Sequence, residues 1–228
     1  MGRMVELPGD GPPGSGYLAA PDLGAGPALI VIEGRWALAD HVGDVCDRYA
    51  AEGFTALAPD LSRGGSPPDE ADGAGRLMLS LNLEQAAKEL GGAIDFLGAS
   101  DAVRGEGVGV TGFGMGAGLA LTLAVQRADA VRACVPFYGL IPWEGATPDW
   151  TRLEAPVQGH FAEHDDAFPA DEARALEETL HGLGKEAQLF FYPAAHGFFD
   201  DTRIEAYDAE SARTAWIRTL DFLRSKLG

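Results

Sequence analysis

The sequence predicts one α/β domain, spanning residues 1–228, in which a mostly parallel, doubly wound sheet is flanked by helices. Short apolar runs, typical of strands buried on both faces, alternate along the chain with helical patterns. A chain of 228 residues suits one such domain and buries a core without disulfides or metals. Several of the expected strands also run into loops rich in glycine, aspartate or histidine, where open α/β sheets place their working residues.

The first half of the chain begins this alternation. Residues 28–32 are a continuous apolar run, as expected for a buried strand. Asp40 is a candidate N-cap for a helix that Gly53 ends. Residues 54–59 then predict the next strand, and a long helix is expected from about residue 74 to residue 97.

The second half continues with strands and helices in turn. The strands expected here are residues 107–111, 131–138, 157–161 and 187–192, and the helices are residues 117–128, 170–183 and 205–227. The last helix is amphipathic and closes the domain. No internal repeat, linker or low-complexity tract interrupts the pattern, which favours a single domain.

The composition indicates which binding partners and which cellular compartment to expect. Thirty-five acidic and seventeen basic residues give a net charge of -18, which would repel nucleic acid and anionic membranes. We therefore expect a small-molecule ligand and a monomer or homodimer. Cys46 and Cys134 lie in apolar patterns without a disulfide framework, and no run has signal-peptide or membrane-helix character. These features predict a cytoplasmic protein.

A glycine-rich turn joins the expected strand 107–111 to the helix after it. Its sequence, Gly-Phe-Gly-Met-Gly over residues 112–116, has the spacing of a G-x-S-x-G elbow but carries Gly114 at the centre. A plain strand–helix turn is an alternative. A dinucleotide fingerprint is less favoured, because the turn lies in mid-chain and lacks the following acidic residue. No metal-ligand spacing is present, so neither a metal nor a cofactor is expected.

Two later loops carry an acid and a histidine. Asp165 and Asp166 follow the expected strand 157–161 and compete for the place of a catalytic acid. His196 follows the strand 187–192, where a general base would stand. A glycine-rich turn, an acid and a histidine in this order, each after its strand, predict an acid–base pair of the hydrolytic triad type.

The chain resembles the dienelactone hydrolase family of α/β-hydrolases over nearly its whole length. The stretches that carry the resemblance are residues 30–33, 51–54, 58–61, 112–116, 137–139, 165–169 and 192–198. The resemblance implies the α/β-hydrolase fold, with a hydrolase's active site at the ends of its strands.

The family's site residues map onto this chain one by one. The resemblance implies that Asp165 is the triad acid, His196 the base, and Glu33 the carboxylate beside the nucleophile. The oxyanion donors would be the backbone N–H groups of Met115 and of Gly34 or Arg35. The aromatic residues expected to line the substrate pocket are Trp36, Tyr138, Trp143, Trp150 and Phe198.

Two departures from the family alter the expected chemistry. Gly114 stands where the family has a cysteine, and Asp200 where it tends to have an arginine for a substrate carboxylate. We therefore expect hydrolysis of a lactone, ester or related carbonyl compound, or a proton-transfer isomerisation or cyclisation, by acid–base chemistry without a covalent step. The alternatives are a non-catalytic protein that binds a small apolar ligand, and a glycine introduced into an ordinary hydrolase.

Overall fold

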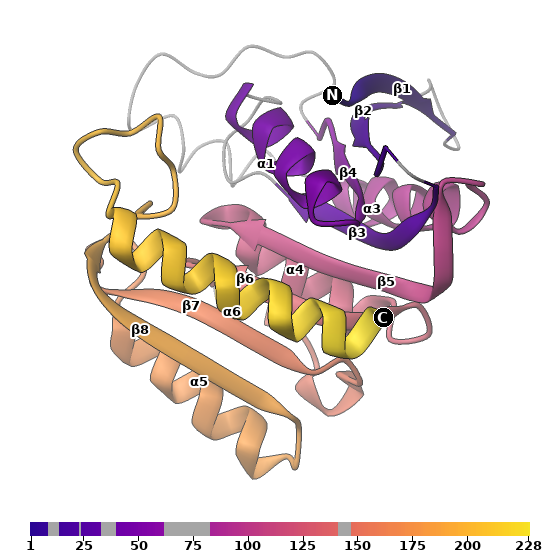
Figure 1. The fold of residues 1–228 in the computed structure, drawn as a ribbon. Helices are drawn as coiled ribbons and strands as arrows, with labels where there is room; N and C mark the ends of the chain where they lie inside the picture. The colour runs from indigo at the N-terminus through magenta and orange to yellow at the C-terminus, as the bar shows by residue number, and fades with distance from the viewer. Residues whose placement is uncertain (9–13, 23, 33–39, 62–82, 141–146) are drawn as a thin grey trace. The chain divides into compact units, whose positions relative to one another are not determined.

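A computed structural model describes the chain except for residues 9–13, 23, 33–39, 62–82 and 141–146. The chain forms two compact units, Met1–Glu106 and Gly107–Gly228. Each unit contains both strands and helices (Figure 1), and the predicted α/β class is confirmed. No helix in the described ranges is long and apolar enough to cross a bilayer.

The first unit contains four strands and two described helices. They are β1 (Arg3–Leu7), β2 (Gly14–Ala19), β3 (Gly26–Ile32), α1 (Asp40–Ala51), β4 (Thr55–Pro59) and α3 (Leu83–Gly98). The strand order is β1-β2-β4-β3, in which only the β3–β4 pair is parallel. Every residue of β3 and β4 is buried, as the apolar runs predicted. The sequence did not predict β1 and β2, because these short antiparallel strands carry polar residues and glycines instead of an apolar run.

The second unit contains the remaining strands. Its elements are β5 (Val103–Phe113, which starts just before the unit does), α4 (Met115–Gln126), β6 (Val131–Phe137), η2 (Trp150–Arg152), β7 (Val157–His164), α5 (Ala170–Gly182), β8 (Ala187–Ala195) and α6 (Ala209–Leu227). The order β5-β6-β7-β8 is parallel throughout. The predicted start of the last helix, residue 205, is wrong. The helix begins at Ala209 because Asp208 is its N-cap and accepts a 2.8 Å hydrogen bond from the Ser211 N–H.

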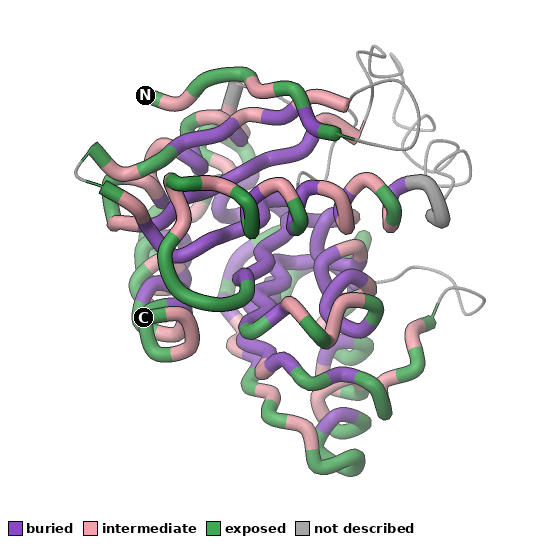
Figure 2. Tube along the Cα trace, turned by 90° about the vertical axis from the view of Figure 1, so that its right-hand side faces the viewer, coloured by how far each residue is buried: buried purple, intermediate pink, exposed green. Residues whose placement is uncertain are grey.

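Helices cover both faces of the strands of this second unit. Side chains alternate along a strand, so His160 and its neighbour Phe161 on β7 point to opposite faces. His160 reaches Thr219 of α6, whereas Phe161 contacts Phe191 of β8, over which the guanidinium of Arg174 from α5 lies. Figure 2 shows that long stretches of the chain are buried and that exposed residues alternate with buried ones along the turns of several helices. The doubly wound arrangement predicted from the sequence is therefore present in this unit.

The outer side of β8, the last strand in this order, is occupied by side chains of α5. Glu177 Oε1 accepts a 2.7 Å hydrogen bond from the Leu189 N–H, and His181 Nε2 lies 2.8 Å from the Ala187 carbonyl oxygen. Pro193, farther along the strand, has no N–H group. Side chains of one helix thus bond to two backbone groups of this strand on the side away from β7.

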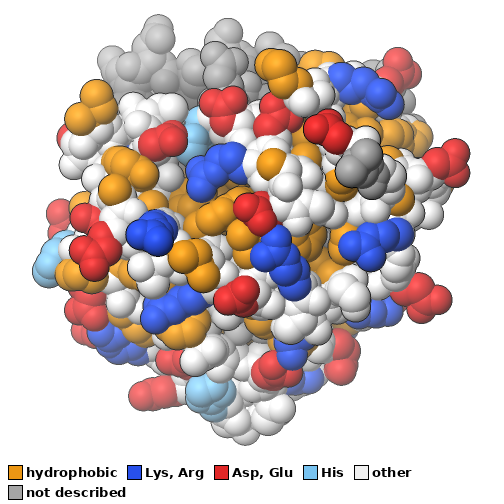
Figure 3. Space-filling model, viewed as in Figure 1, with side chains coloured by type: hydrophobic (Ala, Val, Ile, Leu, Met, Phe, Trp, Pro, Cys, Tyr) orange, Lys and Arg blue, Asp and Glu red, His pale blue; other side chains and the backbone are white. Residues whose placement is uncertain are grey.

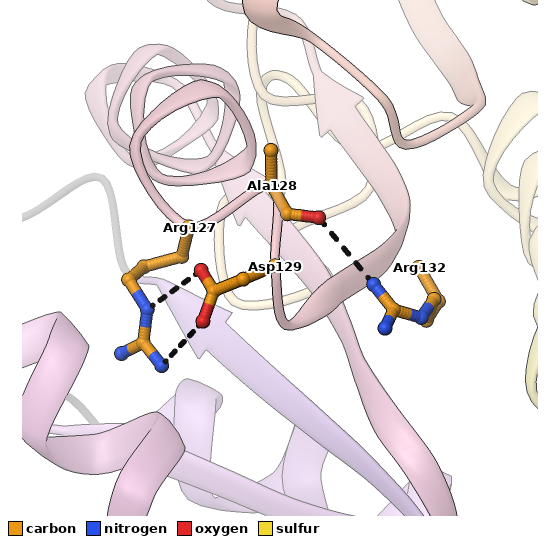
Figure 4. Close-up of polar contacts among 4 residues, drawn as sticks. All are labelled: Arg127, Ala128, Asp129 and Arg132. Atoms are coloured by element: carbon orange, nitrogen blue, oxygen red, sulfur yellow. Dashed lines mark hydrogen bonds and ion pairs between the residues drawn. The ribbon is translucent and has the colours of Figure 1, made fainter.

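The turn between α4 and β6 is held mainly by backbone bonds. The Val131 N–H donates to the Arg127 carbonyl at 2.8 Å. Arg127 also pairs with both carboxylate oxygens of Asp129, at 3.2 and 3.4 Å, and Arg132 donates to the Ala128 carbonyl at 3.4 Å (Figure 4). Asp129 is exposed and Arg127 is partly exposed, so the ion pair adds little stability. Acidic and basic side chains are likewise interspersed over the face drawn in Figure 3.

Candidate active site

An aspartate and a histidine meet where β7 and β8 end. Asp165 Oδ2 lies 2.9 Å from Nδ1 of His196, and the Asp165 side chain is 1% exposed. Its other oxygen, Oδ1, accepts hydrogen bonds from the N–H groups of Ala167 and Phe168 at 2.9 and 2.8 Å. Three donors therefore fix the carboxylate. Asp166, the other aspartate that the sequence left open, is exposed and does not make these bonds.

This hydrogen bonding decides which nitrogen of His196 can act as a base. A carboxylate accepts hydrogen bonds, so Nδ1 of His196 must carry the proton that it donates to Asp165. Nε2 of the neutral ring then has a free electron pair and can accept a proton. The His196 side chain is 29% exposed, so solvent reaches the ring. The pair is arranged as a general base with its orienting acid.

Aromatic rings hold the imidazole of His196 from two sides. Phe168 stacks on it at 5.7 Å between ring centroids, with 28° between the planes. Tyr138 meets it edge-on at 5.2 Å, and Phe198 packs against Tyr138 at 5.3 Å. Tyr138 and Phe198 were expected at the site. Phe168 was not, although its place three residues after Asp165 explains how the loop reaches the ring.

Gly114 adopts the conformation of a strained strand–helix elbow. Its φ of 53° and ψ of -121° lie where residues with a β-carbon are strained, and it directly precedes α4. Its N–H donates to the Phe137 carbonyl at 3.0 Å. The backbone of Gly139 passes so close that a β-carbon there would collide with the Gly114 carbonyl oxygen. The elbow geometry is thus present although the residue at its centre has no side chain.

Tyr138 is the only non-glycine residue with a positive φ in the described part of the chain. Its φ is 34°, and its N–H donates a 2.7 Å hydrogen bond to the carbonyl oxygen of His160 on β7. The side chain is buried between His196 and Phe198. A strained backbone beside a base marks a position that the surrounding structure determines strongly.

Several predicted site residues lie outside the described residues. They are Glu33, Gly34, Arg35, Trp36 and Trp143. Met115 begins α4 directly after Gly114, and Trp150 begins η2. The catalytic or binding roles of all seven remain predictions.

The two cysteines are not available as nucleophiles. Cys46 and Cys134 are fully buried and form no disulfide. Burial raises the pKa of both thiols far above its usual value, which suppresses the reactive thiolate. Neither thiol is therefore suited to nucleophilic attack in the folded protein.

A polar network next to the aromatic residues of the site was not predicted from the sequence. The His160 network, as we call it, consists of His160, Tyr192, Arg218 and Thr219. His160 Nδ1 lies 2.8 Å from the Tyr192 hydroxyl and Nε2 lies 3.0 Å from the Thr219 hydroxyl. Arg218 Nη1 donates to the same Tyr192 hydroxyl at 3.1 Å. Only the histidine in strand 157–161 could have indicated it from sequence.

The His160 network should make stability depend on pH. Burial, and to a lesser degree the charge of Arg218, lowers the pKa of His160 to about 3. The unfolded chain, with a histidine pKa of about 6.5, therefore binds this proton first, and stability falls as the pH drops from about 6.5 towards 3. The expected slope, measured by urea denaturation, approaches about 1.4 kcal/mol per pH unit below pH 5.5.

A neutral replacement tests the origin of this slope. In the His160→Gln variant, the slope of unfolding free energy against pH should fall by the contribution of about one proton. The His164→Gln variant, changed at an exposed position, should keep the wild-type slope. An unchanged slope in His160→Gln would mean that other groups cause the dependence.

Comparison with known proteins bears on the whole chain. Residues 15–227 match the model of the dienelactone hydrolase family. The protein usf of Aquifex pyrophilus is 33% identical over 239 residues, with both chains covered completely. A Klebsiella pneumoniae protein of known structure is 27% identical, superposes with a TM-score of 0.87 and covers 98% of each chain. A dienelactone hydrolase-like promiscuous phosphotriesterase from metagenomic libraries has the same fold, with 23% identity, a TM-score of 0.87 and coverage of 100% and 99%.

Proposed function

The chain belongs to the dienelactone hydrolase family, and from this premise we propose that it hydrolyses a small lactone, ester or related carbonyl compound by direct attack of water. In this proposal Gly114 replaces the side-chain nucleophile, so that no acyl-enzyme forms. His196 is the base, and Asp165 orients it.

The observation that carries the proposal is the hydrogen bond between Asp165 and His196. A carboxylate fixed by two backbone N–H groups holds the imidazole with Nε2 free to take a proton. An oriented acid–histidine pair of this kind serves proton transfer, whereas packing alone does not require it. Positioned acid–base groups typically contribute about 10²–10⁴-fold to a rate and an oxyanion donor about 10²–10³-fold, so that together they give about 10⁴–10⁷-fold without a nucleophile.

The proposed reaction has two proton transfers. His196 Nε2 takes a proton from a water molecule while the water oxygen bonds to the carbonyl carbon, whose π electrons move to the carbonyl oxygen. The tetrahedral oxyanion then re-forms the C=O bond and expels the alkoxide, to which the imidazolium returns the proton. The products are a carboxylic acid and an alcohol, which stay joined when the substrate is a lactone.

Backbone N–H groups would stabilise the charged intermediate. The N–H of Met115, at the first turn of α4, is the proposed oxyanion donor. Gly34 or Arg35 is the proposed second donor, and Glu33 the proposed additional carboxylate, as the resemblance implies. Removing one such donor typically costs about 10²–10³-fold in rate.

Turnover by the purified protein tests the proposal. The panel should contain small esters, lactones including a dienelactone, and a phosphotriester. We expect steady turnover of a lactone or ester without an initial burst, and an unchanged intact mass of the protein during the reaction. A burst with a covalent adduct would contradict the water mechanism. Binding of a panel member without any product over hours would instead favour a ligand-binding protein.

A further inference from the structure

Hydrogen bonds join the four members of the His160 network in one chain. Arg218 can only donate, so the Tyr192 hydroxyl accepts from it, and that hydroxyl also lies 2.8 Å from Nδ1 of His160. Nε2 of His160 lies 3.0 Å from the Thr219 hydroxyl. Both ring nitrogens of His160 therefore have a hydroxyl partner, and the two hydroxyls fix the plane of the imidazole.

The network reaches one wall of the site through the main chain. The carbonyl oxygen of His160 accepts the N–H of Tyr138 at 2.7 Å, where the Tyr138 backbone has its unusual φ of 34°. The ring of Phe137, the residue before, packs on the His160 imidazole at 4.7 Å. A shift of His160 would therefore release the strained backbone that aims the Tyr138 ring at His196.

The network reaches a second wall through a side chain. The ring of Tyr192 packs on Phe198 at 5.1 Å, and Phe198 packs on Tyr138 at 5.3 Å. Tyr192 lies on β8, four residues before His196. Arg218 also covers the ring of Phe190, with its guanidinium carbon 4.0 Å from the ring centroid, and so ties α6 to β8. The strand that leads into His196 is thus anchored by the same side chains.

We infer that the His160 network positions the imidazole of His196, through Tyr138 on one route and through Tyr192 and Phe198 on the other. Its members are positioning residues, since none of the described contacts joins them to the His196 ring itself. The part of the test that uses turnover rests on the proposed function. The part that uses the His196 ring does not.

The Tyr192→Phe variant tests the inference with the smallest change. It keeps the ring against Phe198 but removes the hydroxyl that joins Arg218 to His160. We expect kcat to fall about tenfold or more and KM to stay within about twofold, because a base displaced by a fraction of an ångström still admits substrate. In the proton NMR spectrum, the Nδ1–H resonance of His196 should move or broaden.

A second variant and a control protect the test from a folding failure. Arg218→Met keeps an unbranched stem over Phe190 and removes the donor, so it should reproduce both effects. Tyr207→Phe removes a partly exposed hydroxyl outside the network and should change neither.

The outcomes separate this inference from the proposed function. If both network variants are less stable but keep the wild-type kcat and His196 resonance, the network is only structural and the inference is wrong. If the wild-type protein hydrolyses nothing, the proposed function fails, and the His196 resonance alone decides: a shift in both variants supports positioning, and an unchanged resonance overturns it.

Discussion

The Asp165→Asn variant is expected to lose about 10²–10⁴-fold in hydrolytic turnover, although it replaces a single oxygen by an amide nitrogen. The reason lies in the two backbone N–H groups, of Ala167 and Phe168, that point at Oδ1. They require an oxygen at that position, so the new amide group must face His196. An amide donates, and Nδ1 would have to accept, which transfers the ring proton to Nε2. Nε2 would then have no free electron pair with which to take the proton of the proposed attacking water.

Matched variants make this prediction specific. His196→Ala removes the base itself and should lose at least as much turnover as Asp165→Asn. Asp166→Asn makes the same chemical change at the exposed neighbour and should leave kcat within about twofold. Rates are measured at saturating substrate, and far-ultraviolet circular dichroism shows whether each variant is folded. Equal activity in Asp165→Asn and wild type would contradict the assigned tautomer.

The Gly114→Cys variant is expected to gain covalent chemistry. With a thiol at the elbow and His196 as its base, an activated ester such as 4-nitrophenyl acetate should give a burst of one product per protein and an acetylated intermediate visible by intact mass. The wild-type protein should show neither. The variant is also expected to be less stable than the wild-type protein, because a β-carbon at φ 53° and ψ -121° costs about 1–3 kcal/mol of unfolding free energy.

Iodoacetamide provides a second measurement of the same variant. The native wild-type protein should not react, because Cys46 and Cys134 are fully buried. Gly114→Cys should take up one equivalent, and more slowly when His196→Ala is added, since the imidazole no longer promotes the thiolate. A variant that is folded but neither labels nor acylates would show that position 114 is not where a nucleophile can reach a substrate.

Much of the fold could be predicted from the sequence because its strands are buried. Residues 28–32, for example, are all apolar, and such a continuous apolar run is typical of a strand buried on both faces. The burial of every residue of β3 confirms this prediction. The family resemblance drawn from the glycine-rich turn and the two later loops is confirmed as well. The first two strands were missed because polar residues and glycines break up any apolar run there. The start of α6 was misplaced because a cap such as Asp208 is defined by a hydrogen bond rather than by a periodicity.

The site was only partly predictable for a different reason. Asp165 and His196 follow their strands at positions that strand order brings together, so topology alone pairs them. The choice between Asp165 and Asp166, and the stacking of Phe168, depend on how one short loop turns. The His160 network joins residues from two strands and the last helix, up to 59 positions apart, and no local spacing indicates it.

The side chains along the outer side of β8 affect whether another molecule can add a strand to this edge. An uncovered edge strand offers a row of backbone donors and acceptors on which another chain can form a strand, leading to aggregation. Here Glu177 and His181 already bond to Leu189 and Ala187, and Pro193 has no hydrogen to offer. An incoming strand would have to displace those bonds and would bring its own backbone against a charged helix face. Strand addition at this edge is therefore disfavoured, and concentrated protein should resist β-type aggregation there.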